Sequence, residues 1–123
     1  MTFDPLSNRV IGCAIEVHRE LGPGLLESTY QVCLAHELSR AGIRFALQHP
    51  MPVAYKGVLL ECGYRLDVIV ENELILELKA VEAILGIHEA QILTYLKLAH
   101  LKTGLLINFN VAVLKQGIKR FVV

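Results

Sequence analysis

The 123-residue sequence predicts a mixed α/β fold in which one central sheet is flanked by helices. Two helical patterns come first, four segments rich in strand formers follow, and a third helical pattern precedes a buried apolar strand. Hydrophobic residues make up 54% of the chain and charged residues 20%, which excludes a disordered chain. Because two independent cores would each be too small, we expect residues 1–123 to form a single domain.

The first helix is expected to begin at Pro5, because Asp4 suits the N-cap and proline is favoured at the first helical position. Apolar residues then recur at helical spacing until Gly22-Pro23-Gly24 ends the helix. A second helix is expected from about Leu26 to Ala41, with Gly42 as its stop. Its predicted apolar face carries Tyr30, Cys33, Leu34, Leu38 and Ala41.

The strand-like segments are separated by prolines, turn residues and one further helix. Residues 64–70 and 74–80 predict a hairpin joined near Asn72, and a helix is expected from about Ile87 to His100. The expected strands cover residues 43–49, 53–60, 64–70, 74–80, 104–108 and 117–123.

Charge, cysteines and targeting patterns exclude several classes of protein. Twelve Lys plus Arg balance twelve Asp plus Glu, so composition does not favour a strongly basic nucleic-acid binder. The three cysteines form no Cys-x-x-Cys pair, which argues against a disulfide framework or a zinc site. The N-terminus lacks a leader pattern and no apolar run approaches the ~18 residues of a membrane span, so we expect a cytoplasmic protein. The apolar excess predicts a homodimer or larger assembly.

The hairpin carries the most informative charges in the sequence. Because side chains alternate along a strand, a turn centred on Asn72 puts Asp67 opposite Glu77, with Lys79 beside them. Two apposed carboxylates repel each other, and a divalent cation is the simplest remedy because hard cations take carboxylate oxygens. An ammonium group beside that cation can hold or activate water. The alternative is an ion-pair network on a solvated sheet face, completed by Arg65.

Polar residues on two of the predicted helices add to this set. Glu27 lies at the edge of the apolar face of the second helix and is aimed toward the core; alternatively, it is a first-turn glutamate favoured by the helix dipole. His88, Gln91 and Tyr95 share one face of the later helix at i, i+3 and i+7 spacing. The alternative for Gln91 and Tyr95 is hydrogen bonding to backbone inside the core.

Together these residues resemble the GxxExxY proteins of the PD-(D/E)XK nuclease superfamily, which has the restriction-endonuclease-like fold. The resemblance begins at Gly24-Leu25-Leu26-Glu27-Ser28-Thr29-Tyr30 and continues through Gly63-Tyr64-Arg65-Leu66-Asp67 and Glu77-Leu78-Lys79. The Gln-x-x-x-Tyr element within residues 88–95 is similar to that of RecB-type exonuclease domains. Leu66 stands where the superfamily's pattern has a proline.

The resemblance implies a magnesium-dependent nuclease that hydrolyses phosphodiester bonds, with DNA as the substrate and manganese as a substitute metal. It implies that Asp67 and Glu77 ligate the metal together with the backbone carbonyl of Leu78. It further implies that Lys79 positions or activates the attacking water and that Glu27 is an additional carboxylate at the metal.

For the later helix, the resemblance implies that Gln91 and Tyr95 orient the site or touch substrate phosphate, with His88 as a further candidate. Two alternatives remain open: a catalytically silent interaction or self-association module on the same fold, and a dimeric, structure-selective nuclease of the junction-resolving type. A nucleic-acid surface would use basic residues, whose alternative role is simple solvation of the surface. The one dense cluster lies near the C-terminus and consists of Lys115, Lys119 and Arg120; Lys97, His100 and Lys102 are candidates for a second patch.

Overall fold

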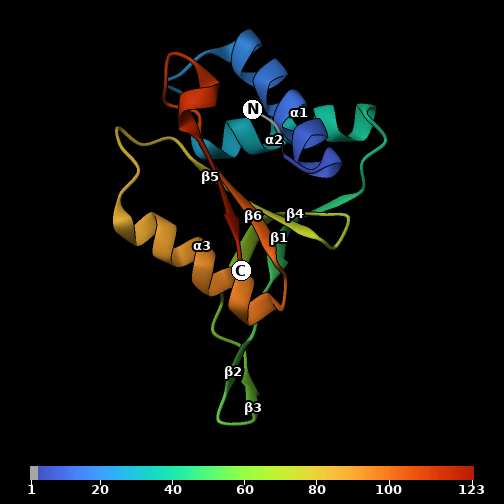
Figure 1. Ribbon diagram of the computed structural model, residues 1–123, viewed down its shortest axis with the longest axis vertical. Coiled ribbons are helices and arrows are strands. Elements are labelled where there is room, and N and C mark those ends of the chain that lie inside the picture. The colour runs from blue at the N-terminus through green and yellow to red at the C-terminus, as the bar shows by residue number, and fades with distance from the viewer. Residues whose placement is uncertain (1–2) are drawn as a thin grey trace.

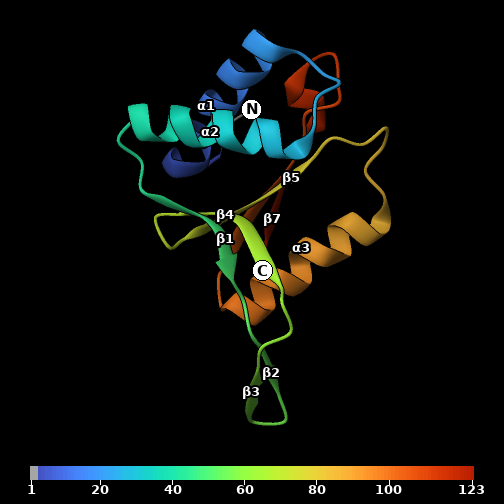
Figure 2. The ribbon, with the colours of Figure 1, turned by 180° about the vertical axis from the view of Figure 1, so that it is seen from behind.

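The computed structural model describes residues 3–123 and has three layers, with a sheet between helices α1 and α2 on one face and α3 on the other (Figures 1 and 2). The predicted α/β class with a central mixed sheet flanked by helices is therefore confirmed. The helices are α1 (Pro5–Leu21), α2 (Glu27–Arg40), α3 (Gly86–Ala99) and the 3-10 helix η1 (Leu114–Gly117). The strands are β1 (Phe45–Pro50), β2 (Val53–Tyr55), β3 (Val58–Leu60), β4 (Arg65–Val70), β5 (Leu74–Lys79), β6 (Thr103–Asn108) and β7 (Ile118–Val122).

The main sheet has the strand order β1-β4-β5-β6-β7, and only β5 and β6 run parallel. A parallel pair needs a crossover, which α3 provides. The β4–β5 hairpin has the predicted register, with Val70 opposite Leu74, and its turn places Asn72 at a φ of 54°. Because β5 and β6 are parallel, their carboxyl ends meet at one edge, where Lys79 lies opposite Asn108.

The two N-terminal helices follow the sequence signals closely. The Asp4 carboxylate caps α1 by accepting a hydrogen bond from the backbone N–H of Ser7, and Gly22 ends the helix. Gly42 follows α2 at a φ of 72°, a left-handed conformation that glycine adopts without strain. The predicted apolar face is wrong at Ala41, which is exposed because it lies just beyond the last helical turn.

Each face of the sheet has its own hydrophobic core. Leu74, Leu76 and Leu78 of β5 pack with α1 and α2, whereas Ile75 packs with α3. A Cβ atom on Gly104 would lie 2.9 Å from the Ile92 side chain, so glycine is needed where α3 crosses β6. Among residues 3–123, no helix is long and apolar enough to cross a membrane. The prediction that the N-terminus lacks a leader pattern includes Met1 and Thr2, which lie outside the described residues.

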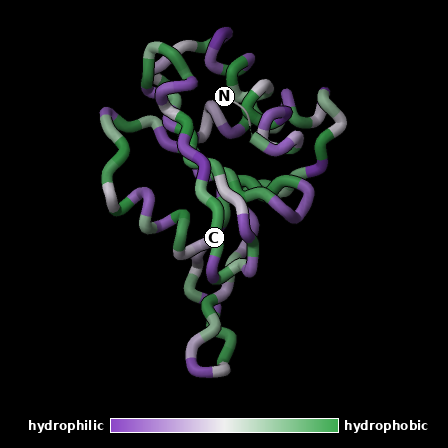
Figure 3. The backbone as a smooth tube through the Cα atoms, in the orientation of Figure 1, coloured by the Kyte–Doolittle hydropathy of each residue, from purple (hydrophilic) through white to green (hydrophobic). Residues whose placement is uncertain are grey.

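The expected strand over residues 53–60 is instead a separate hairpin of β2 and β3. Lys56 and Gly57 form its turn with φ values of 50° and 80°, which fits a two-residue turn with two left-handed positions. The hairpin projects from the sheet in Figure 1, and Figure 3 shows its largely apolar character. Tyr55 and Leu59 are 57% and 69% exposed, so these apolar residues form no part of the core.

Candidate active site

The loop before α2 explains the Gly-x-x-Glu-x-x-Tyr spacing. Gly24 has a φ of 98°, and the buried Tyr30 hydroxyl donates to the Gly22 carbonyl at 2.6 Å. The same hydroxyl accepts from the Leu25 backbone N–H at 3.2 Å, so Tyr30 holds the loop from inside. Glu27 thereby becomes the first residue of α2. Its side chain is exposed, which corrects the expectation that it is aimed toward the core.

Two of the three predicted carboxylates line one cavity of about 380 Å³ between α2 and the sheet. The Asp67 carboxylate accepts from the Leu78 backbone N–H at 2.9 Å. Gln48 donates to Gln31 at 2.7 Å across the same cavity. The lining residues are Glu27, Ser28, Gln31, Gln48, Asp67 and Leu78. The cavity therefore brings Glu27 and Asp67 together with the segment whose carbonyl is the third predicted ligand.

Asp67 reaches this cavity because the alternation of side chains changes at its position. Val68 packs on the α1 and α2 face, but Leu66, two residues earlier, packs in the α3-side core. On the neighbouring β1, Gln48 has a φ of 49°. The β1–β4 ladder does not pair Gln48 with Asp67, although His49 is paired with Leu66. The predicted pairing of Asp67 directly opposite Glu77 lies one step beyond the observed β4–β5 ladder.

Glu77 is the most unusual buried group of the described chain. Its side chain is only 4% exposed, and Oε1 has no hydrogen-bond partner. Burial, reinforced by the nearby Asp67 carboxylate, raises the pKa of Glu77 from 4.5 to about 8, although Lys79 opposes the shift. The nearby Lys79 therefore does not fully offset the free-energy cost of burying the charge of Glu77.

A second cavity, of about 520 Å³, lies on the α3 side of the sheet and contains Lys79. Lys79 Nζ donates to Gln91 Oε1 at 3.5 Å, and Gln91 Nε2 donates to the Tyr95 hydroxyl at 3.0 Å. Gln91 thus bonds to both Lys79 and Tyr95, and these side chains do not bond to backbone in the core as the alternative predicts. His88 also lines this cavity, and its Nδ1 accepts from the Leu85 backbone N–H at 2.9 Å.

The solvated ion-pair network is not what the structure has. Arg65 approaches Glu61 at 4.0 Å, and no ion pair within residues 3–123 includes Asp67, Glu77 or Lys79. The buried position of Glu77 also differs from a solvated sheet face. The carboxylates therefore lack the internal compensation that this alternative requires.

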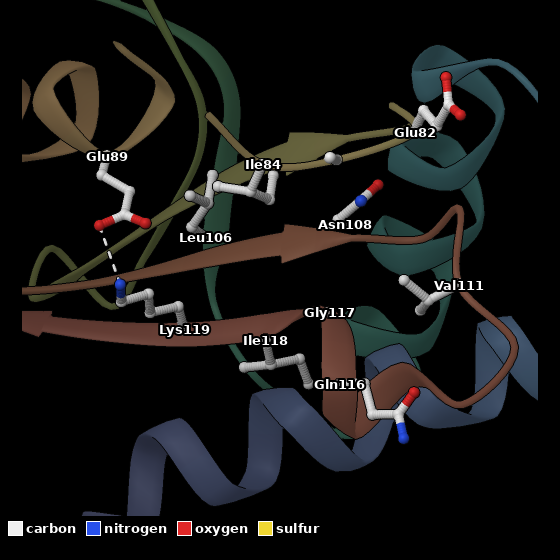
Figure 4. Close-up of a pocket in the computed structure, with 11 residues that line it drawn as sticks. Glu82, Ile84, Glu89, Leu106, Asn108, Val111, Gln116, Gly117, Ile118 and Lys119 are labelled. Atoms are coloured by element: carbon white, nitrogen blue, oxygen red, sulfur yellow. Dashed lines mark hydrogen bonds and ion pairs between the residues drawn. The ribbon is translucent and has the colours of Figure 1, made fainter. Parts of the chain in front are cut away.

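A third cavity, of about 330 Å³, is lined by the carboxyl-terminal part of β6, the start of β7 and the loop before α3, and it contains none of the predicted metal-binding or catalytic residues (Figure 4). Lys119 pairs with Glu89 there at 2.8 Å, and elsewhere Arg120 pairs with Asp4 at 3.0 Å. The expected basic cluster near the C-terminus is thus partly neutralised. The other candidates, Lys97, His100, Lys102 and Lys115, are exposed.

Asn108 is a structural residue that the sequence analysis missed. It is 2% exposed, accepts from the backbone N–H groups of Val81 and Asn110, and donates to the Val81 carbonyl at 2.9 Å. These bonds fix the chain as it leaves β5, next to Lys79. An asparagine at the end of an otherwise apolar strand was the available signal.

The donor set fits a hard divalent cation. Among residues 3–123, no three His, Cys, Asp or Glu side chains are grouped closely enough to hold a metal. The Asp67 carboxylate nevertheless helps to raise the pKa of Glu77, and Leu78, which lines the cavity of Asp67, offers a backbone carbonyl. Carboxylate and carbonyl oxygens are the ligands that magnesium and manganese prefer. Oε1 of Glu77 has no hydrogen-bond partner, so it remains available to ligate such a cation.

Comparison with known proteins agrees with this geometry. Residues 4–121 match a family model described as the PD-(D/E)XK nuclease superfamily. The match includes the β4–β5 hairpin and the cavities that contain Asp67 and Lys79. The five-stranded mixed sheet with its flanking helices is consistent with the restriction-endonuclease-like fold. No curated protein and no solved structure matches the chain.

Proposed function

The chain belongs to the PD-(D/E)XK nuclease superfamily, and from this premise we propose that it is a magnesium-dependent nuclease that hydrolyses phosphodiester bonds in DNA. The observation that carries the proposal is the buried Glu77 carboxyl group with its unpartnered Oε1 beside Asp67. Within the superfamily we assign the chain to the GxxExxY proteins, because Gly24, Glu27 and Tyr30 build one loop and helix start. We propose that it acts as one domain in the cytoplasm.

Asp67 and Glu77 would hold the cation together with the Leu78 carbonyl, and Glu27 would act as a further carboxylate. The bound cation would supply positive charge beside the phosphate that is hydrolysed, and manganese would serve as well as magnesium. Two features of the chain support this assignment. Asp67 is oriented by the Leu78 N–H, and Glu77 is enclosed by the fold, so both carboxylates are held in place before substrate binds.

Lys79 is proposed to hold the attacking water near the phosphate. Its ammonium group has three donors, and the hydrogen bond to Gln91 uses only one of them. Gln91 is in turn oriented by Tyr95, which is 7% exposed and anchored in the α3-side core. We therefore assign Gln91 and Tyr95 to positioning of Lys79, and His88 to the wall of the same cavity.

The test is cleavage of labelled single-stranded, duplex and branched DNA with magnesium or manganese present. We expect the native chain to cut and Asp67→Asn to reduce cleavage by at least about 10³-fold, because a carboxylate at the metal is lost. Glu20→Gln, which removes an exposed carboxylate of α1, is the matched control and should cut normally. Calorimetry with manganese should show binding to the native chain and none to Asp67→Asn.

Lys79→Ala separates chemistry from metal binding. We expect it to abolish cleavage while manganese binding persists, and Lys115→Ala, at an exposed lysine, to change neither. Equal cleavage by Lys79→Ala and the native chain would exclude Lys79 from the reaction. Unchanged manganese binding by Asp67→Asn would refute the metal site itself.

A second candidate function is a catalytically silent module that self-associates. The exposed apolar side chains of the β2–β3 hairpin, such as Tyr55, Val58 and Leu59, favour it. Light scattering at high concentration tests self-association, for which a homodimer mass is expected and a monomer mass would count against it. Absence of cleavage and of metal binding together would favour this function over the nuclease.

A further inference from the structure

Tyr64 presents a half-exposed aromatic ring to the cavity that contains Lys79. Its side chain is 46% exposed, although its backbone carbonyl is fixed by the Met51 N–H at 2.9 Å. The ring meets Tyr95 edge-on, with centroids 6.1 Å apart and planes inclined by 62°. Tyr64 therefore holds an aromatic face at the mouth of the cavity without belonging to the core.

The composition of this cavity suits a flat heteroaromatic group with polar edges. Its volume of about 520 Å³ is in the usual range of small-molecule sites. Ile87, Ala90 and Leu98 contribute apolar surface. Polar groups are supplied by Lys79, His88, Gln91 and Thr94. A nucleobase matches this combination, and its attached phosphate would lie on the Lys79 side.

The overall charge of the protein does not favour binding to a polyanion. Its formal net charge is zero, so contacts with phosphates depend on local lysine and arginine side chains. Five of the cationic side chains also pair with carboxylates of the same chain: Arg19, Arg44, Arg65, Lys119 and Arg120. Stacking of bases on aromatic rings is the main alternative source of affinity for nucleic acids.

We propose that Tyr64 stacks on an unpaired nucleobase next to the scissile phosphate, so that the substrate is single-stranded nucleic acid or a single-stranded segment. In a duplex, both faces of each base are covered by neighbouring bases, and Tyr64 has no face to contact. This inference rests on the proposed nuclease function, because that function places a phosphate at Lys79.

The first test measures binding without metal, so that no cleavage interferes. The probes are a fluorescent single-stranded DNA oligonucleotide and the duplex of the same sequence. Tyr64→Ala should weaken binding to the single strand by about 5- to 100-fold, and Tyr64→Phe should retain it within about 2-fold. Tyr55→Ala is the matched control, because Tyr55 is a similarly exposed tyrosine outside the cavity. Urea unfolding confirms that each variant is folded.

A second probe separates the base from the phosphate. A single strand of abasic nucleotides keeps the phosphates and removes every base, so the native chain should bind it as weakly as Tyr64→Ala binds the ordinary strand. Equal binding of Tyr64→Ala and Tyr55→Ala, equal loss on the duplex, or no single-strand binding by the native chain would overturn the inference.

The cleavage assay distinguishes this inference from the nuclease function. On single-stranded substrate, Tyr64→Ala should raise KM with kcat nearly unchanged, whereas Lys79→Ala should lower kcat. Loss of stacking with cleavage intact would reject only the role of Tyr64. Stacking by a chain that never cuts any substrate would reject the nuclease function and leave base binding standing.

Discussion

Glu77 and Asn108 are both buried polar residues near the carboxyl ends of the neighbouring strands β5 and β6, yet their surroundings differ. Asn108 is 2% exposed, and its amide both accepts from and donates to the backbone of Val81. Glu77 is 4% exposed, and its Oε1 has no partner. Buried polar groups are normally satisfied within the fold, so the difference marks Asn108 as structural and Glu77 as a group that awaits a ligand.

The chemistry of the two side chains explains why only one of them is satisfied. An amide carries donors and acceptors, so a nearby loop with one free N–H and one free carbonyl can match it. A carboxyl group donates only while it is protonated; once Glu77 is ionised it only accepts, and the adjacent Asp67 carboxylate repels it. A bound cation would interact favourably with both carboxylates. This is why Glu77, the buried polar residue without a partner, is also one of the proposed metal ligands.

The largest expected effect concerns the pH dependence of stability. Because burial raises the pKa of Glu77 to about 8, the folded chain keeps this proton in a range where the unfolded chain, with an ordinary pKa near 4.5, has lost it. The metal-free protein should therefore lose stability as the pH rises from about 5 to 8, by up to about 1.4 kcal/mol per pH unit. Glu77→Gln removes this contribution.

Urea unfolding of the native chain and Glu77→Gln at several pH values measures this contribution as a difference, so the titration of other groups cancels. The gap in free energy of unfolding should widen in favour of Glu77→Gln as the pH rises, while the variant fails to cleave DNA. Parallel profiles would mean that Glu77 is not buried unpaired. Glu20→Gln, at an exposed site, should follow the native profile.

The next largest effect is expected at Asn108, the buried polar residue whose hydrogen bonds are satisfied. Asn108→Ala leaves the Val81 N–H and carbonyl without their partner, and we expect it to lower the free energy of unfolding by about 2–3 kcal/mol. Asn110→Ala is the matched control, because this variant keeps the backbone N–H of residue 110, which donates to the Asn108 side chain. Thermal or urea unfolding at pH 6 measures both. Similar losses for the two variants would remove the structural role given to Asn108.

Local signals in the sequence were sufficient for much of the fold. Asp4 and Pro5 predicted the start of α1, and Asn72 predicted the β4–β5 turn, because each acts through neighbouring backbone. The separate β2–β3 hairpin was missed because its turn uses Lys56, a residue that seldom adopts a positive φ. The β5 charges could be predicted as a group, since alternation places Glu77 and Lys79 on one face.

Other features of the candidate site depend on long-range packing. The change of face at Asp67 arises between β4 and the irregular Gln48 of β1, and no periodicity within β4 predicts it. The link from Lys79 through Gln91 to Tyr95 likewise requires α3 to lie across β5. Strand and helix periodicity assign each side chain to a face, but the contact between faces of different elements comes only from the assembled fold.

The smallest expected effect comes from Tyr30, a third buried polar residue and a satisfied one. Its hydroxyl bonds to Gly22 and Leu25, while its ring stacks on Phe109 with centroids 4.4 Å apart. Tyr30→Phe keeps the stacking and removes the hydroxyl, so the free energy of unfolding should fall by only about 1 kcal/mol in urea unfolding. Tyr55→Phe, at an exposed ring, should change it by much less. Because the Tyr30 hydroxyl holds the loop that starts α2 at Glu27, cleavage should also weaken modestly in Tyr30→Phe. Unchanged cleavage would mean that Glu27 keeps its place without that loop, and that the Gly-x-x-Glu-x-x-Tyr spacing serves the core more than the site.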